Sequence, residues 1–175
     1  MERGLNIAAS LLALILLAPT MLAIAALVKW ASEGPIFCQA PRVGREGRHF
    51  MLLKFRSMDN ERTQVTPVGR LLRRYSLDKL PQLLNVLRGE MSLIGPRPER
   101  PEFVELFNQD VNRYDDRHRV KSGITGWAQV HGLRGQTSLA ERVEWDNYYI
   151  AHWSLGLDLK IFALTLLALL RNDAE

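Results

Sequence analysis

Several common kinds of functional site are missing from this sequence of 175 residues. It contains one cysteine, Cys38, so an internal disulfide framework is excluded and a reducing compartment is compatible with the chain. Its four histidines, His49, His118, His131 and His152, do not have the spacing of metal ligands. Neither a Gly-x-Ser-x-Gly nucleophile motif nor a Walker phosphate loop is present. The chemistry must therefore come from other residues.

Charge is missing from the whole segment Leu5 to Val28. Because about 20 apolar residues cross a bilayer, this segment is long enough to span one. Pro19 lies near its middle, where proline removes a backbone donor and kinks or breaks a helix. The charges on either side show no strong asymmetry that would set an orientation. These features leave a spanning helix and a re-entrant hairpin both open, with burial in a soluble core as a third alternative.

Positive charge is in modest excess, with a formal net charge of +4 and a pI of about 9.5. Such an excess suits a partner that carries phosphate, whether a nucleotide, a nucleic acid or an anionic lipid surface. The aromatic residues do not alternate with basic residues as in single-strand nucleic-acid platforms, so no nucleic-acid partner is expected.

The remaining sequence predicts an α-rich α/β (α+β) fold with few short strands. No internal repeat or low-complexity linker is present, so one domain is the simplest account. The residue patterns predict a strand at 49–58, helices at 69–87 (broken near 76–81), 101–114 and 140–153, and an interfacial or core helix at 155–170. The glycine-rich stretch 120–136 has little room for regular structure.

Basic residues in or beside turn-rich segments form a candidate phosphate-binding set. Arginine can bind phosphate through two parallel hydrogen bonds, and lysine supplies a point charge. A solvated basic face is the alternative for any single member. The set consists of Lys54, Arg56, Arg73, Arg74, Arg97 and Arg134.

A lone carboxylate, Asp78, lies in the motif "RRYSLDKLPQ" behind two arginines. Since Pro81 fits only the first turn of a helix, we expect a helix to begin near residues 76–80 and Asp78 to lie at its N-terminus. The helix dipole and nearby arginines would favour the ionised form, which can attack an electrophilic phosphorus. An ordinary N-cap aspartate is the alternative.

Four long blocks together resemble a known family. They read "GPIFCQAPRVGREGRHFMLLKFRSM", "TPVGRLLRRYSLDKLPQLLNVLRGEMSLIGPRP", "VKSGITGWAQVHGLRG" and "WDNYYIAHWSLGLDLKI". In this order they resemble the bacterial sugar transferases of the monotopic phosphoglycosyl transferase family, the polyprenyl-phosphate sugar-1-phosphate transferases. The resemblance implies transfer of a sugar-1-phosphate from a nucleotide diphosphate sugar, usually a UDP-sugar, to undecaprenyl phosphate in exopolysaccharide, capsule or O-antigen synthesis.

The resemblance also implies roles for individual residues. Asp78 matches the nucleophile of a ping-pong reaction, Arg97 the phosphate-binding arginine of Gly-Pro-Arg-Pro, and Lys54 and Arg73 further basic positions of the active site. It implies a magnesium ion and a location at the cytoplasmic face of the bacterial inner membrane. It also implies a re-entrant membrane helix-hairpin over residues 1–32, broken at a proline, and one cytosolic, membrane-associated catalytic domain with amphipathic interfacial helices over residues 33–175. Pro19 matches that break, although Ala18 stands where the family usually has serine.

One position departs from the family. Lys79 follows Asp78, where the family has a glutamate that helps to hold magnesium. Three interpretations follow: another carboxylate, Glu90 or Glu99, takes the metal; Lys79 replaces the charge of the metal; or the protein is a weakened or inactive relative that acts as a membrane-bound binding or scaffold protein. The transferred sugar is not readable from the sequence. A homodimer is possible, and the chain is expected to be either a minimal member or the catalytic domain of a longer protein.

Overall fold

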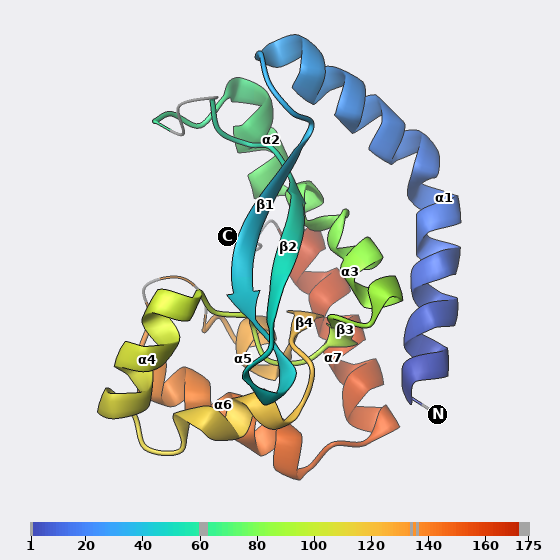
Figure 1. Ribbon diagram of the computed structural model, residues 1–175. Helices are drawn as coiled ribbons and strands as arrows, with labels where there is room; N and C mark the ends of the chain where they lie inside the picture. The colour runs from blue at the N-terminus through green and yellow to red at the C-terminus, as the bar shows by residue number, and fades with distance from the viewer. Residues whose placement is uncertain (1, 60–62, 134, 136, 172–175) are drawn as a thin grey trace.

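A computed structural model describes residues 2–59, 63–133, 135 and 137–171. Helices predominate and the strands are few and short, as the sequence predicts (Figure 1). The helices are α1 (Glu2–Ala31), α2 (Pro67–Arg74), α3 (Gln82–Arg88), α4 (Pro101–Asp110), α5 (Trp127–Val130), α6 (Leu139–Ala151) and α7 (Leu155–Leu170). The strands are β1 (Phe37–Val43), β2 (His49–Phe55), β3 (Ser92–Ile94) and β4 (Gly123–Thr125), and three short 3₁₀ helices are η1 (Arg45–Gly47), η2 (Leu77–Lys79) and η3 (Tyr114–Arg119).

The antiparallel hairpin β1–β2 stands at the centre of the molecule (Figure 1). Its register places Cys38 opposite Lys54 and Arg42 opposite Phe50. Because side chains alternate along a strand, these four residues lie on one face of the hairpin. Lys54 and Arg42 therefore share a face, and this face lines the cavity described below.

A second, parallel pair of strands, β3 and β4, forms where three glycines let the backbone approach closely. A Cβ atom at Gly95, Gly123 or Gly126 would overlap a neighbouring backbone atom. Two backbone bonds join the segments, from the Gly95 amide to the Thr125 carbonyl at 2.9 Å and from the Gly123 amide to the Pro96 carbonyl at 2.9 Å. The glycine-rich stretch thus contains β4 and α5, more regular structure than expected, because glycine here permits close packing rather than a loose loop.

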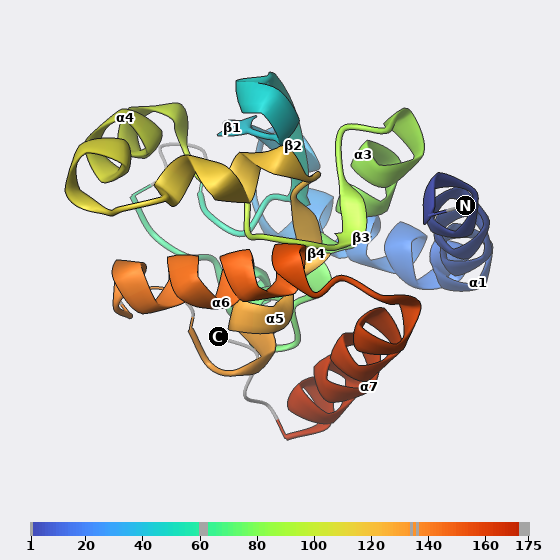
Figure 2. The ribbon, with the colours of Figure 1, turned by 90° about the horizontal axis from the view of Figure 1, so that it is seen from below.

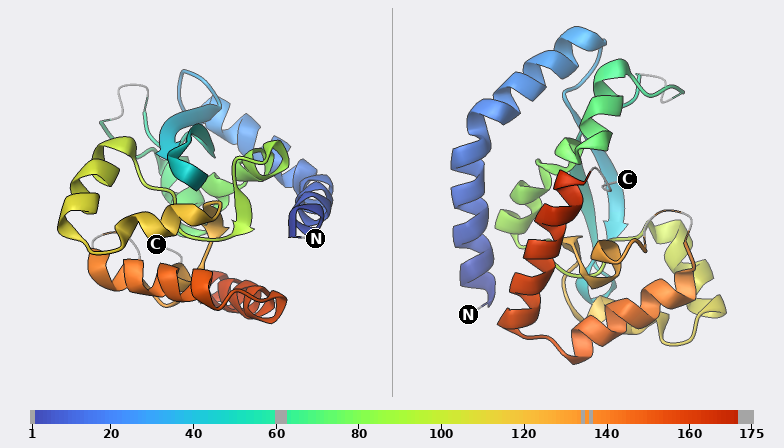
Figure 3. Two further views of the ribbon diagram at one scale, coloured as in Figure 1. Left: turned by 60° about the horizontal axis from the view of Figure 1, so that its bottom comes forward. Right: turned by 180° about the vertical axis from the view of Figure 1, so that it is seen from behind.

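The apolar N-terminal segment is one helix, α1, with Pro19 inside it. Its ribbon bends near the middle, the part that contains Pro19 (Figures 1 and 3). The predicted break is therefore a bend within one helix and not a turn between two helices. The stretch Arg3–Ala31 is long and apolar enough to cross a membrane by length and composition, and little of it is buried. Re-entry into the membrane remains a prediction.

One face of α1 packs against β2 and α2. Ile24 and Val28 form a buried cluster with Phe55 of β2 and Leu72 of α2. Near the start of α1, the Asn6 Oδ1 atom accepts a hydrogen bond from the Leu93 amide at 2.9 Å. The rest of α1 and much of α7 expose large apolar side chains, and both helices are visible from behind (Figure 3). Their predicted contact with a membrane interface is compatible with this exposure.

Arg56 joins the end of α1 to the end of β2. Its guanidinium is buried and donates to the carbonyl oxygens of Val28 at 3.3 Å and Ser32 at 2.7 Å, and to that of Glu33. Carbonyl groups at a helix C-terminus have no intrahelical partner, so an arginine that satisfies several of them holds the helix end in place. Arg56 was expected among the phosphate-binding residues, and in the structure its guanidinium binds the carbonyl groups at the end of α1.

Replacing Arg56 by alanine should lower the free energy of unfolding by about 2–4 kcal/mol, because buried carbonyls lose charged donors. Thermal unfolding of the detergent-solubilised chain, followed by circular dichroism, measures this. Arg70→Ala, on the exposed surface of α2, is the matched control and should change stability by no more than about 0.5 kcal/mol. Equal melting temperatures for the two variants would contradict the assigned role of Arg56.

Candidate functional site

A cavity of about 310 Å³ lies between the β1–β2 hairpin, the loop after β3, and the start of α4. Among the residues that the structure describes, six cationic side chains and one carboxylate, Glu99, line its walls. The cations are Arg42, Lys54, Lys79, Arg97, Arg100 and Arg142. A cavity with this charge pattern suits a ligand that carries more than one phosphate group.

Asp78 lies next to this cavity in the 3₁₀ helix η2. Ser76, which precedes it, has a left-handed backbone with φ of 54°, an uncommon conformation for a residue other than glycine. This sharp turn ends α2 and directs the chain into η2, where Leu77 and Leu80 pack against the α1 cluster. Apolar packing on both sides of Asp78 therefore fixes the position of the carboxylate.

The Asp78 side chain is close to one cation of the cavity. Its Oδ2 atom lies 4.0 Å from the Nζ atom of Lys54, and the residue is only 6% exposed. The prediction that Asp78 lies at a helix N-terminus holds for the single turn of η2, whereas α3 begins later, at Gln82. Lys79, the next residue, lines the cavity, and its Nζ atom lies 3.2 Å from the Ser76 Oγ atom.

Lys54 lies in a strongly positive environment. Burial lowers its pKa; Asp78 opposes this effect, and the nearby Arg97, Arg42 and Arg73 lower the pKa further. The Arg73 Nε atom donates to the Ser57 Oγ atom at 2.9 Å, which holds that guanidinium near the end of β2. The structure thus brings together four of the residues expected from the sequence: Asp78, Lys54, Arg73 and Arg97.

Lys79 and Glu99, also expected from the sequence, line the same cavity, whereas Arg56 and Glu90 do not belong to its described lining. Arg56 is turned toward the end of α1, as described above, and does not line the described part of the cavity. Arg134 falls outside the described residues. Glu90 accepts a hydrogen bond from the Asn85 Nδ2 atom at 2.6 Å, and Asn85 in turn bonds to the β2 backbone.

Two arginines of the cavity, Arg42 and Arg100, were missed by the sequence reasoning. Arg42 belongs to β1, and only the hairpin register shows that it shares a face with Lys54. Arg100 precedes α4, and its guanidinium lies 5.8 Å from the centre of the Phe103 ring. Nothing local distinguishes either arginine from a solvated basic residue, because their proximity arises from the tertiary fold.

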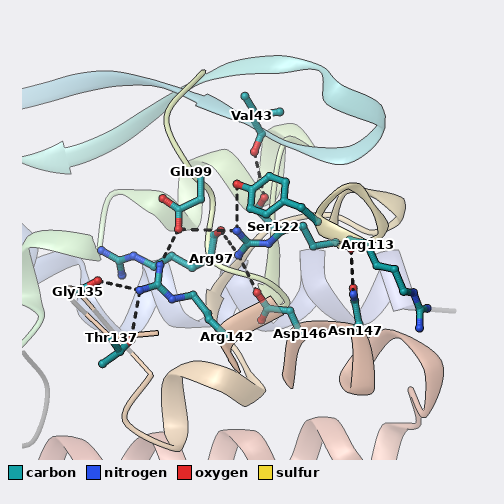
Figure 4. A network of polar contacts seen from close by, with 12 residues as sticks. Val43, Arg97, Glu99, Arg113, Ser122, Gly135, Thr137, Arg142, Asp146 and Asn147 are labelled. Carbon is teal, nitrogen blue, oxygen red and sulfur yellow. Dashed lines mark hydrogen bonds and ion pairs between the residues drawn. The ribbon is translucent and has the colours of Figure 1, made fainter. Parts of the chain in front are cut away.

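A buried network of opposite charges supports the Arg97 loop (Figure 4). Arg117 donates to the Arg97 carbonyl at 3.1 Å and to the Asp146 carboxylate at 2.7 Å. Glu99 accepts from Arg142 at 3.0 Å and lies 3.8 Å from Arg117. Burial raises the pKa of Asp146, and the ion pair with Arg117 opposes that rise. This network fixes the loop through its backbone and leaves the Arg97 side chain in the cavity.

The network was also missed by the sequence reasoning, although its α6 members repeat with helical spacing. Arg142 and Asp146 are buried on the same face of α6 as Val143 and Tyr149. A polar residue on such a stripe is normally assigned to the surface, and only the facing Arg117 and Glu99 reveal why it is buried.

The described side chains do not fit a magnesium ion. Mg²⁺ prefers carboxylate oxygens together with water and phosphate oxygens. Glu99 is held by two arginines, and Asp78 is paired with Lys54. Among the residues that the structure describes, no three histidine, cysteine, aspartate or glutamate side chains gather into a possible metal site.

Comparison with known proteins yields one family and several relatives. The model of the family described as bacterial sugar transferase matches residues 1–172. The undecaprenyl-phosphate glucose phosphotransferase of Komagataeibacter xylinus is 45% identical, over 94% of this chain and 35% of its own length. The UDP-glucose:undecaprenyl-phosphate glucose-1-phosphate transferase of Escherichia coli (strain K12) is 42% identical, over 94% and 39%. The protein of the same name from Caulobacter vibrioides (strain ATCC 19089 / CIP 103742 / CB 15) is 42% identical, over 98% and 70%.

The chain thus spans little more than a third of the length of the first two of these relatives. The similarity nevertheless extends over almost all of the present sequence, including the cavity, α1 and α7.

Lys54 should give phosphate binding in this cavity an alkaline limit below the pH at which ordinary lysines titrate. Its pKa is lowered from the model-compound value of 10.5, so the ammonium loses its proton, and its attraction for phosphate, as pH rises toward 10.5. Below the folded-state pKa, burial of the charged form costs stability, and that cost disappears as pH rises toward 10.5. In Lys54→Arg, the alkaline fall in affinity for inorganic diphosphate, measured by calorimetric titration, should move to higher pH, since arginine stays protonated. An identical alkaline limb in both proteins would exclude Lys54 as the titrating group.

Proposed function

Because the chain belongs to the bacterial sugar transferase family, we propose that it transfers a sugar-1-phosphate from a UDP-sugar to undecaprenyl phosphate. The products are the polyprenyl diphosphate sugar and UMP. The names of several relatives support this substrate pair: those from Xanthomonas campestris pv. campestris and Klebsiella pneumoniae are also UDP-glucose:undecaprenyl-phosphate glucose-1-phosphate transferases. A relative from Aeromonas hydrophila is named for UDP-N-acetylgalactosamine, so the sugar itself stays open.

The observation that carries the proposal is the juxtaposition of one buried carboxylate and many cations. Asp78 lies 4.0 Å from Lys54 beside a cavity that also contains Arg42, Arg97 and Arg100. A phosphate ester is a poor electrophile in water because its negative charge repels an attacking anion. Cations fixed around the phosphate reduce that repulsion and stabilise the charge of the transition state.

Two in-line displacements account for the reaction. An Asp78 carboxylate oxygen forms a bond to the β-phosphorus, and the bond to the bridging oxygen breaks, so that UMP leaves with the bonding electrons. A phosphate oxygen of undecaprenyl phosphate then attacks the same phosphorus and displaces the Asp78 carboxylate. Lys54 lies next to the carboxylate before the reaction, and its flexible stem lets it follow the negative charge onto the transferring phosphoryl group.

We place this reaction at the cytoplasmic face of the bacterial inner membrane. The exposed apolar surface of α1 would enter the membrane, and its bend at the part containing Pro19 would return the helix to the same side. The guanidinium of Arg56 holds the end of this helix beside the end of β2, and Arg56 is two residues from Lys54 in the sequence. The headgroup of a lipid substrate would thereby meet the cavity at the membrane surface.

Lys79 favours a charge-based alternative to the magnesium ion that the family resemblance implies. It lies next to Asp78 in the wall of the cavity, where its ammonium would neutralise phosphate charge. The same residue favours a second candidate function, a binding or scaffold protein without turnover, if the lysine cannot replace a metal-binding glutamate. The two functions differ in whether the natural sequence releases UMP.

Replacing Asp78 by asparagine should reduce UMP release from UDP-glucose and undecaprenyl phosphate by at least about a thousandfold, because the amide cannot serve as the nucleophile. Wild-type protein mixed with UDP-glucose alone should gain the mass of a hexose phosphate in intact-mass spectrometry. Asp116→Asn is the control, since Asp116 pairs with Arg113 on an exposed surface and should retain wild-type rates. Equal rates for wild type and Asp78→Asn would rule out covalent catalysis by Asp78.

The wild-type reaction should change little when magnesium is replaced by EDTA, since the described carboxylates are already paired with cations. Lys79→Glu should instead require magnesium, because it creates two adjacent carboxylates. Arg70→Glu is the charge-reversal control on exposed α2. Complete loss of wild-type turnover in EDTA would contradict a charge-substituting Lys79. Turnover only in Lys79→Glu would support the scaffold function for the natural sequence.

A further inference from the structure

The two ends of the cavity differ in their surroundings. Lys79 lines one part of the cavity and follows Asp78 in η2, and Leu77 of η2 packs against the cluster that includes Ile24 and Val28 of α1. Arg100 and Phe103 mark the other end, at the start of α4. Seen from below, α1 and α4 lie on opposite sides of the molecule (Figure 2). One end of the cavity therefore borders the membrane helix, and the other faces away from it.

We propose that Arg100 and Phe103 form a nucleoside subsite, which binds the uridine part of the sugar donor, with Arg42 beside them for the attached phosphate. This inference rests on the proposed function, because it assumes a uridine nucleotide as donor. It assigns to the start of α4 a role in donor recognition and not only in contact with a membrane.

The geometry at the start of α4 provides flat surfaces suited to a nucleobase. The Phe103 ring is 38% exposed and stacks on Phe107 with 5.6 Å between ring centres and 12° between planes. The Arg100 guanidinium lies 5.8 Å from the Phe103 ring centre. Aromatic rings and arginine planes are the usual stacking partners of unpaired bases. Stacking on Phe107 holds the Phe103 ring in place before a ligand arrives.

Charge at this end of the cavity favours an anionic ligand. Burial lowers the pKa of Arg42; the neighbouring Arg100 and Arg97 lower it further, and Glu99 and Glu102 oppose this. Arginine remains protonated even so, and three guanidinium groups repel one another. A phosphate placed between Arg42 and Arg100 would relieve that repulsion.

The order of the two displacements also separates nucleoside from lipid. In an in-line reaction, UMP leaves on the side of the phosphorus opposite Asp78, and the lipid phosphate later attacks from that side. Both phosphates therefore use the same cations in turn, and the groups attached to them must diverge. The end near α1 suits the polyprenyl chain, which leaves the α4 end for the nucleoside.

A membrane contact is the main alternative for Phe103. The same helix exposes Leu106, so Phe103 and Leu106 together could lie against lipid. The Phe103 ring nevertheless lines the cationic cavity, whereas Leu106 does not belong to the described lining. If Phe103 binds the nucleobase, removal of the ring should weaken UMP binding. If it lies against lipid, removal of the ring should weaken association with a membrane.

The test is calorimetric titration of the full chain in detergent with UMP and, separately, with inorganic diphosphate. Phe103→Ala should weaken UMP binding by roughly ten- to a hundredfold, the loss expected for one stacked base. It should leave diphosphate binding within about twofold, since no phosphate contact is removed. Phe103→Tyr keeps the ring and should restore UMP binding. Arg100→Ala should weaken both ligands.

Arg45→Ala is the matched control for Arg100→Ala. The two side chains are 55% and 56% exposed, and each pairs with a glutamate, Glu46 and Glu102 respectively. Arg45→Ala should bind both ligands as the wild type does. If Phe103→Ala keeps the wild-type affinity for UMP, the proposal of a nucleoside subsite is wrong. A variant that keeps this affinity but associates less with liposomes would show that Phe103 contacts the membrane. Wild-type UMP release would then still support the proposed function, whereas its absence would count against that function independently of the subsite.

Discussion

The crowding of positive charge around one cavity is the constraint on which the rest of this structure depends. Arg42, Lys54, Arg97 and Arg100 come from three segments that are distant in sequence, and all line the same space. Two unit charges at 4 Å still interact by about 4 kcal/mol at the effective dielectric constant of a protein surface. The folded state must offset this repulsion before any ligand binds, and it does so with a few buried carboxylates.

These carboxylates lie in two different positions. Asp78 is within reach of Lys54, where it both compensates charge and is available for chemistry. Glu99 and Asp146 are held by Arg142 and Arg117, so they balance the cations from behind the Arg97 loop. A buried ion pair contributes little net stability, but loss of one partner leaves an uncompensated charge. The network therefore contributes mainly geometry: it holds the loop while leaving the Arg97 side chain in the cavity.

Local pattern predicts most of the helices and the helical turn that holds Asp78, whereas the expected grouping of Asp78 with Lys54, Arg73 and Arg97 came from the family resemblance. Pro81 and the break around Ser76 place η2 correctly, and the apolar tail becomes α7 over residues 155–170, as expected. The position of Arg56 could not be predicted, since it depends on where α1 ends relative to β2. Arg42, Arg117 and Asp146 escaped notice for the same reason: each acquires its partner only when segments far apart in sequence meet.

The arrangement of elements also bears on why the proposed reaction would proceed in two steps. In the proposed reaction, the leaving nucleotide phosphate and the entering lipid phosphate use the same cations of a cavity of about 310 Å³. If the nucleotide phosphate and the lipid phosphate both need Lys54 and Arg97, the two substrates cannot be bound productively together. A covalent intermediate on Asp78 removes that conflict, because it retains the sugar-phosphoryl group while UMP leaves and the lipid phosphate enters. Once UMP has left, the cations of the cavity no longer have an anionic partner. The bent α1 helix would then guide undecaprenyl phosphate from the membrane to these cations.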